Sequence, residues 1–303
     1  MKAVLFVGHG SRDPQGNDQI HQFVEGFLPD LNPLVLYETC FLEFARPDIA
    51  EGIERCIVRG ATEVALIPLM LLPAGHSKIH IPAAIDAAKE KYPGVTFTYG
   101  KPIGIHYETS VILKERLQDA GIDPDEAGEQ DAVILLGRGG SDADANSDLC
   151  KIARILWEKT SFETVEPAFY GVTKPSLPQA VERVKKLGAK KIIILPYFLF
   201  TGVLIKRIEQ DLALFREQYP ELSFTLADYF GFHPKLKVIV ADRIDEALGG
   251  KSLMNCDTCQ YRFEAGIHHH HHHDHDHDHH HHDHDHGHHH HGHDHDHEKE
   301  AIR

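Results

Sequence analysis

Short runs of apolar residues recur along the chain with a spacing that predicts alternating strands and helices. The first half has such runs near residues 2–7, 33–38, 63–69 and 95–99, and the second near residues 131–136, 164–170, 190–195 and 223–227. They are rich in Val, Ile and Leu and do not alternate with polar residues, which is typical of parallel strands covered on both faces. Amphipathic stretches that predict helices lie between the strands of the first half, near residues 16–28, 47–59, 79–91 and 107–119. Each half is therefore predicted to form an open, doubly wound α/β sheet with right-handed crossovers.

The chain also contains an internal duplication. Residues 4–11 (VLFVGHGS) return as residues 133–140 (VILLGRGG), and residues 65–76 return as residues 192–203. The hydrophobic frame of the first half is thus repeated in the second. We predict two tandem α/β domains related by this duplication.

Composition sets the boundaries of these domains. Residues 121–130 combine Gly, Pro and acidic residues, as expected of a linker. We predict an N-terminal domain over residues 1–122 and a C-terminal domain over residues 131–250. Residues 251–303 form a third segment whose composition differs abruptly from the rest.

Charge and cysteine content narrow the class of protein. The formal net charge of the 303 residues is −15, which argues against nucleic acid as a partner because phosphate binding requires a basic surface. The longest apolar run, residues 192–205, is shorter than a membrane span and contains Pro196 and Gly202. Five cysteines fit a reducing compartment better than a disulfide framework. We expect a cytoplasmic protein with no membrane partner.

The two copies differ at positions that are able to carry chemistry. In the order of the chain, His9, Glu43 and His76 are replaced in the second copy by Arg138, Gly171 and Val203. Each of the first three follows a predicted strand, and open parallel sheets bind ligands beyond the carboxyl ends of their strands. We predict that the first copy carries the site, and we expect alanine at Arg138 or Val203 to leave most activity.

Two imidazoles and one carboxylate suit a divalent transition metal, with Zn, Co, Ni and Fe(II) all compatible. The same groups accept protons near neutral pH. His80 lies one helical turn after His76 and is a further candidate ligand. The sequence leaves simpler interpretations open, with His9 as a turn residue and residues 75–77 as a helix start capped by Ser77. We interpret His21, His106 and His233 as structural or surface residues.

The C-terminal segment carries two further signals. Cys256 and Cys259 form a C-x-x-C motif, which suits a zinc half-site, a redox pair or part of an iron–sulfur centre. Residues 268–297 contain only His, Asp and Gly, so we expect this tract to be disordered without metal. We assign it to metal buffering, beginning with His268, His269, His270, His271, His272 and His273. A purification tag would explain only those six residues and not the alternating His-Asp that follows.

Several motifs resemble the sirohydrochlorin chelatases. They are residues 8–12 (GHGSR), residues 41–47 (FLEFARP), and residues 68–82, where PLML leads to AGH and then to IP. Together with the duplication, the Met-x-Cys-x-x-Cys motif and the histidine-rich tail, they resemble the long-form cobaltochelatase branch of that family, which serves anaerobic cobalamin (vitamin B12) biosynthesis. One departure is His80, where relatives commonly carry Asp.

The resemblance implies the class II chelatase fold, in which two flavodoxin-like α/β halves face a cleft. It implies insertion of Co²⁺ into sirohydrochlorin without ATP and with release of two protons. His9 and His76 would be the metal-binding and catalytic histidines, and we add Glu43 as the proton acceptor. The resemblance also implies a 4Fe–4S cluster at Cys256 and Cys259.

Other expectations follow from this hypothesis. Sirohydrochlorin is a polycarboxylate, so Arg12, Arg46 and Lys78, near the predicted sheet edge, are candidates to meet its carboxylates. The partners would be sirohydrochlorin, divalent metal ions and a second copy of the chain in a homodimer. The alternatives are the ferrochelatase of sirohaem synthesis and a non-enzymatic metal store or metallochaperone. The last does not explain why one copy alone carries His9 and His76.

Overall fold

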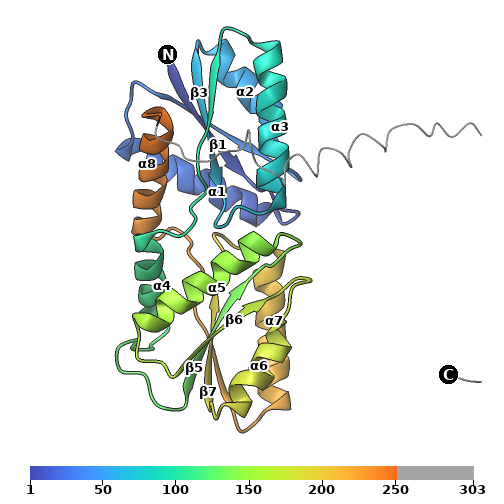
Figure 1. The fold of residues 1–303 in the computed structure, drawn as a ribbon, viewed down its shortest axis with the longest axis vertical. Helices are drawn as coiled ribbons and strands as arrows, with labels where there is room; N and C mark the ends of the chain where they lie inside the picture. The colour runs from blue at the N-terminus through green and yellow to red at the C-terminus, as the bar shows by residue number, and fades with distance from the viewer. Residues whose placement is uncertain (251–303) are drawn as a thin grey trace, which may run out of the picture.

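The computed structural model describes residues 1–250, which form two halves that are stacked end to end (Figure 1). The elements of the first half are β1 (Lys2–Gly8), α1 (Pro14–Phe27), the 3-10 turn η1 (Leu28–Asp30), β2 (Leu36–Phe41), α2 (Ile49–Val58), β3 (Glu63–Leu69), α3 (Gly75–Lys91), β4 (Thr96–Tyr99) and α4 (Tyr107–Asp119). Those of the second half are β5 (Asp131–Gly137), α5 (Ala143–Glu158), β6 (Thr164–Phe169), α6 (Leu177–Lys186), β7 (Lys191–Pro196), α7 (Val203–Gln218), β8 (Ser223–Leu226) and α8 (Pro234–Leu248).

Both sheets have four parallel strands, in the orders β2-β1-β3-β4 and β6-β5-β7-β8. The order is the same in the two halves. In each, the chain passes from the first strand to the second at one edge of the sheet and then crosses back, so that the third and fourth strands lie on the other side of the first. This is the doubly wound arrangement that the alternating strands and helices predicted, with the flavodoxin-like strand order that the family resemblance implied. The predicted fold class is therefore confirmed for the described residues.

Strand β2 is shifted along the chain from its predicted position. The prediction of residues 33–38 was wrong by three residues at each end, because the strand runs from Leu36 to Phe41. The apolar run begins inside a turn, in which the Val35 and Leu34 amides donate to the backbone and side-chain oxygens of Asn32. Leu34 is consequently 82% exposed, although its apolar side chain suggested a buried strand residue.

Histidines that we interpreted as structural begin two equivalent helices. His106 accepts a hydrogen bond from the Glu108 amide at the start of α4, and His233 accepts one from the Lys235 amide at the start of α8. A capping side chain of this kind satisfies an amide that the first turn of a helix leaves unpaired. The structural interpretation of both residues is confirmed.

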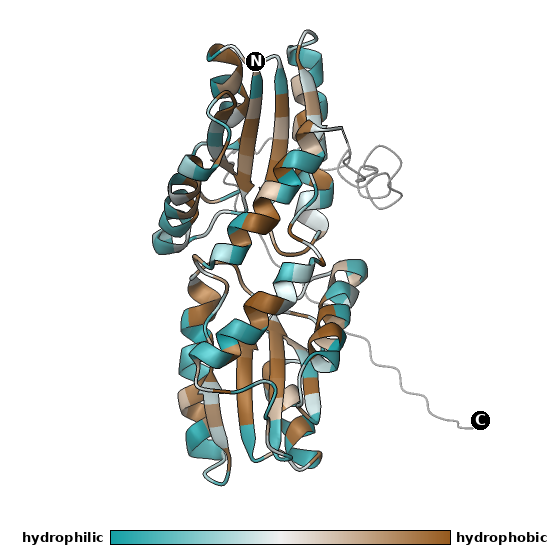
Figure 2. Cartoon of the chain, turned by 90° about the vertical axis from the view of Figure 1, so that its left-hand side faces the viewer, coloured by the Kyte–Doolittle hydropathy of each residue, from teal (hydrophilic) through white to brown (hydrophobic). Residues whose placement is uncertain are grey.

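Each sheet is covered on one face by helices of its own half. The odd-numbered residues of β1, with α2 and α3, bury a core that includes Leu5, Ile53 and Ile81. In the second half, α6 and α7 bury an equivalent core that includes Ile134 and Ile208. Figure 2 shows apolar residues concentrated in the central strands and polar residues distributed over the helices.

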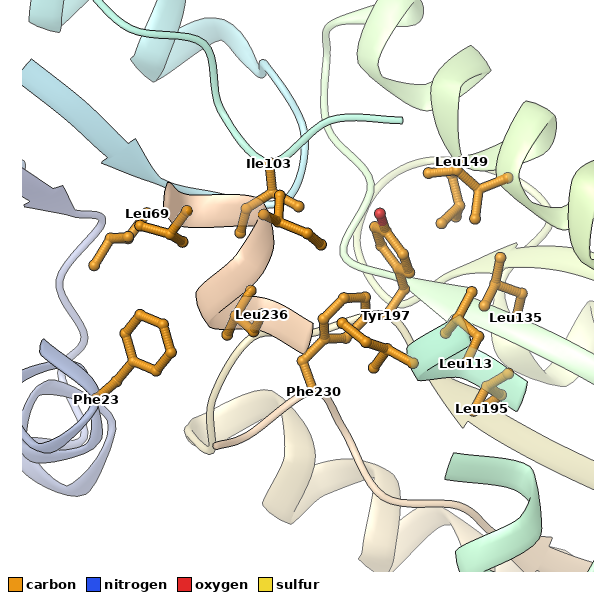
Figure 3. Packing of buried hydrophobic residues seen from close by; sticks show 14 of the residues in the cluster. Phe23, Leu69, Ile103, Leu113, Leu135, Leu149, Leu195, Tyr197, Phe230 and Leu236 are labelled. Atoms are coloured by element: carbon orange, nitrogen blue, oxygen red, sulfur yellow. The ribbon is translucent and has the colours of Figure 1, made fainter. Parts of the chain in front are cut away.

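The other faces of the sheets are covered by an exchange of helices between the halves. Helix α8, the last of the second half, packs on β3 and β4 of the first sheet, whereas α4 of the first half packs on β7 and α5 (Figure 1). One continuous core results, in which Phe23 and Leu69 of the first half lie in the same cluster as Leu135 and Leu195 of the second (Figure 3). The sequence predicted the two sheets but not this exchange.

None of the helices within residues 1–250 has the length and apolar character needed to span a lipid bilayer.

Candidate functional site

The loops that follow β1 and β2 are held together by backbone hydrogen bonds. The amides of Leu42 and Glu43 donate to the carbonyl oxygens of Gly8 and His9 at 2.9 and 3.0 Å, so the pairing of the two strands continues into the loops. Gly10 adopts a φ of +86°, and a Cβ atom there would lie 1.7 Å from the Glu43 carbonyl oxygen. Only glycine permits this approach, which is why the Gly-His-Gly sequence places His9 beside Glu43.

The His9 and Glu43 side chains meet at this edge of the sheet. His9 Nδ1 lies 3.5 Å from Glu43 Oε1 and 3.1 Å from the Gly10 carbonyl oxygen. Both side chains are partly exposed, at 28% and 29%. A carboxylate and a carbonyl can only accept hydrogen bonds, so this environment favours the tautomer that carries its proton on Nδ1 and leaves a lone pair on Nε2. Metal-bound histidines have this arrangement, in which the second ring nitrogen donates to a carboxylate or carbonyl.

Arg138 of the second half reaches the same histidine. Its Nη1 lies 3.1 Å from His9 Nε2. A guanidinium carries donors only and stays protonated, so Nε2 must be the acceptor. The contact joins the two positions that the duplication makes equivalent, and it places Arg138 beside His9 of the first copy.

The second copy repeats the backbone geometry of the first. The Tyr170 and Gly171 amides donate to the Gly137 and Arg138 carbonyl oxygens at 2.9 and 2.7 Å. Gly171 therefore occupies the place of Glu43, but a Cβ atom on it would lie 2.7 Å from the Arg138 carbonyl oxygen. The second loop therefore leaves no room for a side chain at the position where the first loop carries its carboxylate.

His76 and His80 lie near the start of α3, on the segment that follows β3. The helix begins at Gly75 rather than near residue 79, so His76 is in its first turn. Val203 occupies the corresponding place in the first turn of α7. Among the side chains that the structure describes, no group of three or more His, Cys, Asp or Glu is gathered into a preformed metal site.

Two lysines form ion pairs with aspartates of the other half in this region. Lys78 Nζ lies 2.9 Å from Asp142 Oδ2, at the start of α5, and 3.0 Å from Asp144 Oδ2. Asp13, before the start of α1, is the counterpart of Asp142 in the duplication, and it pairs with Lys206, which lies one residue beyond the position equivalent to Lys78. Burial of the Lys78 ammonium acts to lower its pKa, but hydrogen bonds to Asp142 and Asp144 outweigh this and raise the pKa above its ordinary value. Lys78, predicted to meet substrate, therefore already has carboxylate partners.

We expect Lys78→Met to lower the free energy of unfolding by roughly 1–3 kcal/mol at pH 7, because it leaves the Asp142 carboxylate without its cation. Because the pKa of Lys78 is raised in the folded state, its contribution to stability is complete at pH values below the unfolded-state pKa of about 10.4. The contribution is lost as the pH rises through the higher pKa of the folded state. Urea unfolding at pH 7 and at successively higher pH measures both effects.

The control is Lys89→Met on the same helix, where the exposed pair with Asp86 spans 3.8 Å. We expect it to cost less than about 0.5 kcal/mol. Equal losses from the two substitutions would contradict a structural role for the Lys78 pair.

The other two predicted carboxylate-binding residues lie on exposed loops. Arg46 pairs with Asp48 and with Glu51, the latter at 3.2 Å. Arg12 lies with its guanidinium 4.9 Å from the centre of the Phe44 ring. Phe44 has a φ of +63°, which is rare for a bulky residue and presents the ring at the surface beside Glu43. The sequence analysis did not propose Phe44 as a site residue, and it named Arg138 only as the residue that replaces His9 in the second copy.

A signal for Arg138 was nevertheless present in the sequence. Arg138 occupies the place of His9 in the duplication. When the edges of two equivalent sheets face each other, equivalent loops meet, and they make contact through equivalent residues. For Phe44, no pattern in the sequence predicted the backbone conformation that exposes the ring.

Several predictions concern residues outside those that the structure describes. They are the disordered tail, the buffering histidines from His268 to His273 and the cluster ligands Cys256 and Cys259. The described cysteines bear on the cluster indirectly. Cys40 and Cys56 are fully buried in the core of the first half, and burial raises the pKa of the Cys40 thiol well above its ordinary value and that of Cys56 to about 12, so neither presents a thiolate at the protein surface.

Comparisons with known proteins show which family the chain resembles. A sirohydrochlorin cobaltochelatase from Priestia megaterium is 60% identical over 262 residues, which cover 86% of this chain and 85% of that relative. A sirohydrochlorin ferrochelatase from the same organism is 38% identical over 83% of this chain and 92% of its own length. The solved structure of SirB from Bacillus subtilis with Fe³⁺ superposes with a TM-score of 0.73 at 36% identity, over 83% of this chain and 98% of that one. The family model described as CbiX matches residues 3–120 and 132–247. The chain therefore belongs to the CbiX family.

Proposed function

We propose that this protein is a sirohydrochlorin cobaltochelatase, which inserts Co²⁺ into sirohydrochlorin and releases two protons without consuming ATP. The observation that carries the proposal is the 60% identity to the Priestia megaterium cobaltochelatase, because it extends over 86% of this chain and 85% of that relative. Its product would be cobalt-sirohydrochlorin, in an early step of anaerobic cobalamin biosynthesis.

The comparisons favour cobalt over iron as the metal. The ferrochelatase from the same organism is 38% identical, far below the cobaltochelatase. Ligand chemistry alone does not make this choice, because sites of imidazole and carboxylate bind the divalent first-row metals in a common order of affinity that does not single out cobalt. Iron insertion for sirohaem is therefore the second candidate within the same reaction class.

The geometry around His9 supports a division of roles in the reaction. The Nε2 lone pair of His9 would present Co²⁺ to the macrocycle, with His76 of α3 as the second imidazole and His80 as a further candidate. Two pyrrole N–H protons must leave as four nitrogens take the metal. Glu43, 3.5 Å from His9 Nδ1 and partly exposed, would accept a proton and pass it to water.

Binding of the polycarboxylate would use cations near this edge. Arg12 is exposed and lies over the Phe44 ring, so its donors are available to a carboxylate while the ring offers an apolar surface beside it. Arg46 and Lys78 already hold carboxylates of the protein. We therefore assign the stronger role in substrate binding to Arg12.

The experiment that tests the proposal is anaerobic insertion of Co²⁺, Fe²⁺ and Ni²⁺ into sirohydrochlorin, followed by the absorbance of the macrocycle. We expect the highest rate with Co²⁺. A higher rate with Fe²⁺ would favour the ferrochelatase, and no insertion with any metal would favour a non-enzymatic metal store.

We propose that the histidine-rich tail buffers metal and delivers it to the site. Deletion of residues 268–303 is expected to leave the rate at saturating Co²⁺ largely unchanged. It should lower the rate when Co²⁺ is limiting, because a tethered buffer raises the local metal concentration. Rates of the full chain and the truncated chain at both concentrations check this. A loss of nearly all activity at saturating Co²⁺ would contradict it.

A 4Fe–4S cluster at Cys256 and Cys259 is also part of the proposal, on the basis of the C-x-x-C spacing together with the family resemblance. The buried Cys40 and Cys56 are unsuitable as its other ligands, which favours exposed Cys150, a non-cysteine ligand or a homodimer that combines two motifs. Anaerobically reconstituted protein should show a cluster absorbance band that the double serine variant lacks. The free thiols of the described cysteines support a reducing compartment, and we assign the protein to the cytoplasm.

A further inference from the structure

We propose that Arg138 is a positioning residue that occupies the metal-binding lone pair of His9 until a carboxylate of the substrate draws the guanidinium away. This inference rests on the proposed function and deepens it, because it makes binding of metal at His9 depend on binding of the tetrapyrrole. The juxtaposition that carries it is the distance of 3.1 Å between Arg138 Nη1 and His9 Nε2.

The contact with Arg138 determines which nitrogen of His9 is protonated. Arg138 is able only to donate, so Nε2 accepts and the ring proton lies on Nδ1. Nδ1 in turn faces two acceptors, the Gly10 carbonyl at 3.1 Å and the Glu43 carboxylate at 3.5 Å. Arg138 therefore holds His9 in the tautomer that is suited to metal binding.

Arg138 and a metal ion compete for the same electron pair on His9 Nε2. A lone pair that accepts a hydrogen bond from a guanidinium is unavailable to a cation, and the positive charge of Arg138 repels a divalent ion as well. In the absence of substrate, Co²⁺ must displace Arg138 before it binds Nε2. The arginine thus weakens metal binding to the resting protein.

A carboxylate of the substrate is the group that would draw Arg138 away from His9. Arg138 is exposed, and a guanidinium forms stronger, bidentate hydrogen bonds with a carboxylate than the single bond that it forms here with a neutral imidazole. Sirohydrochlorin carries several carboxylates. Its binding would move Arg138 from Nε2 to one of them, and the freed lone pair would then take the metal beside the macrocycle.

The variants for the test are Arg138→Ala, Arg138→Lys and the control Lys174→Ala. Lys174 is exposed on the loop after β6, so its removal changes the charge of the same sheet edge by the same amount. Each chain is also prepared with His9→Ala. Subtracting the Co²⁺ absorbance of the His9→Ala partner isolates the His9 signal, because the histidine-rich tail contributes equally to both.

The first measurement is Co²⁺ binding without tetrapyrrole. We expect Arg138→Ala to bind Co²⁺ at His9 about tenfold more tightly than the unsubstituted chain, and Lys174→Ala to resemble that chain. The second is binding of metal-free sirohydrochlorin, followed by its fluorescence. We expect it to weaken about tenfold in Arg138→Ala and to recover in part in Arg138→Lys, which keeps the charge but not the bidentate geometry.

An unchanged Co²⁺ affinity in Arg138→Ala would overturn the competition at Nε2, and an unchanged sirohydrochlorin affinity would overturn the exchange to a carboxylate. Equal effects from Lys174→Ala would show that the changes in Co²⁺ affinity and in sirohydrochlorin affinity come only from the loss of one positive charge at this edge, and would overturn the inference. Failure of the proposed function is distinguishable, because it appears as a lack of cobalt insertion by the unsubstituted chain, whereas the Co²⁺ measurement requires no turnover.

Discussion

Replacement of His9 by alanine is expected to lower the rate of cobalt insertion by at least about a hundredfold. The substitution removes both a metal ligand and a group able to carry a proton, and loss of a positioned acid–base group alone costs on the order of a hundredfold or more. It also leaves Glu43 without the imidazole that lies 3.5 Å away. The measurement is the steady-state rate with saturating Co²⁺ and sirohydrochlorin.

Two further variants make this prediction specific. Val203→Ala changes the position in α7 that corresponds to His76, and Val203 is 40% exposed, so we expect both the fold and most of the activity to remain. Glu43→Gln is expected to give an intermediate rate, because the amide keeps the shape but cannot accept a proton. Circular dichroism first confirms that each variant is folded. A Val203→Ala rate as low as that of His9→Ala would require a site with chemistry in both halves.

The second large effect is expected on stability. Ile53→Ala is expected to lower the free energy of unfolding by about 2–5 kcal/mol, because Ile53 is only 1% exposed in the core between α2 and the first sheet. We also expect the second half to unfold together with the first, since α8 packs on the first sheet, α4 packs on the second, and the two helices pack on each other. Trp157, the single tryptophan, lies on α5 and reports on the second half.

The test compares two probes of urea unfolding. Circular dichroism follows both halves, whereas Trp157 fluorescence follows the second half alone, and their transitions in Ile53→Ala should coincide at a lower midpoint. Val58→Ala is the matched control on the same helix, because Val58 is 81% exposed. A Trp157 transition that stays at its original midpoint in Ile53→Ala would show that the halves unfold independently.

Local patterns were sufficient to predict much of this structure. Uninterrupted apolar runs identified the strands because a strand covered on both faces requires apolar residues at every position. The positions of His9, Glu43 and His76 after consecutive strands placed them at one edge of the first sheet for the same topological reason. The register of β2 was mispredicted because the turn at Asn32 takes up the first part of its apolar run.

Local patterns and the comparison of the two copies were thus enough to predict the duplicated α/β fold and the residues that distinguish one copy from the other. How the two copies meet became visible only in the folded chain. The exchange of α4 and α8 depends on which sheet offers each helix a complementary apolar face, and this is a property of two assembled surfaces and not of any local pattern. The contact of Arg138 with His9 has the same origin, because residues separated by 129 positions come together only when the two sheet edges are brought face to face.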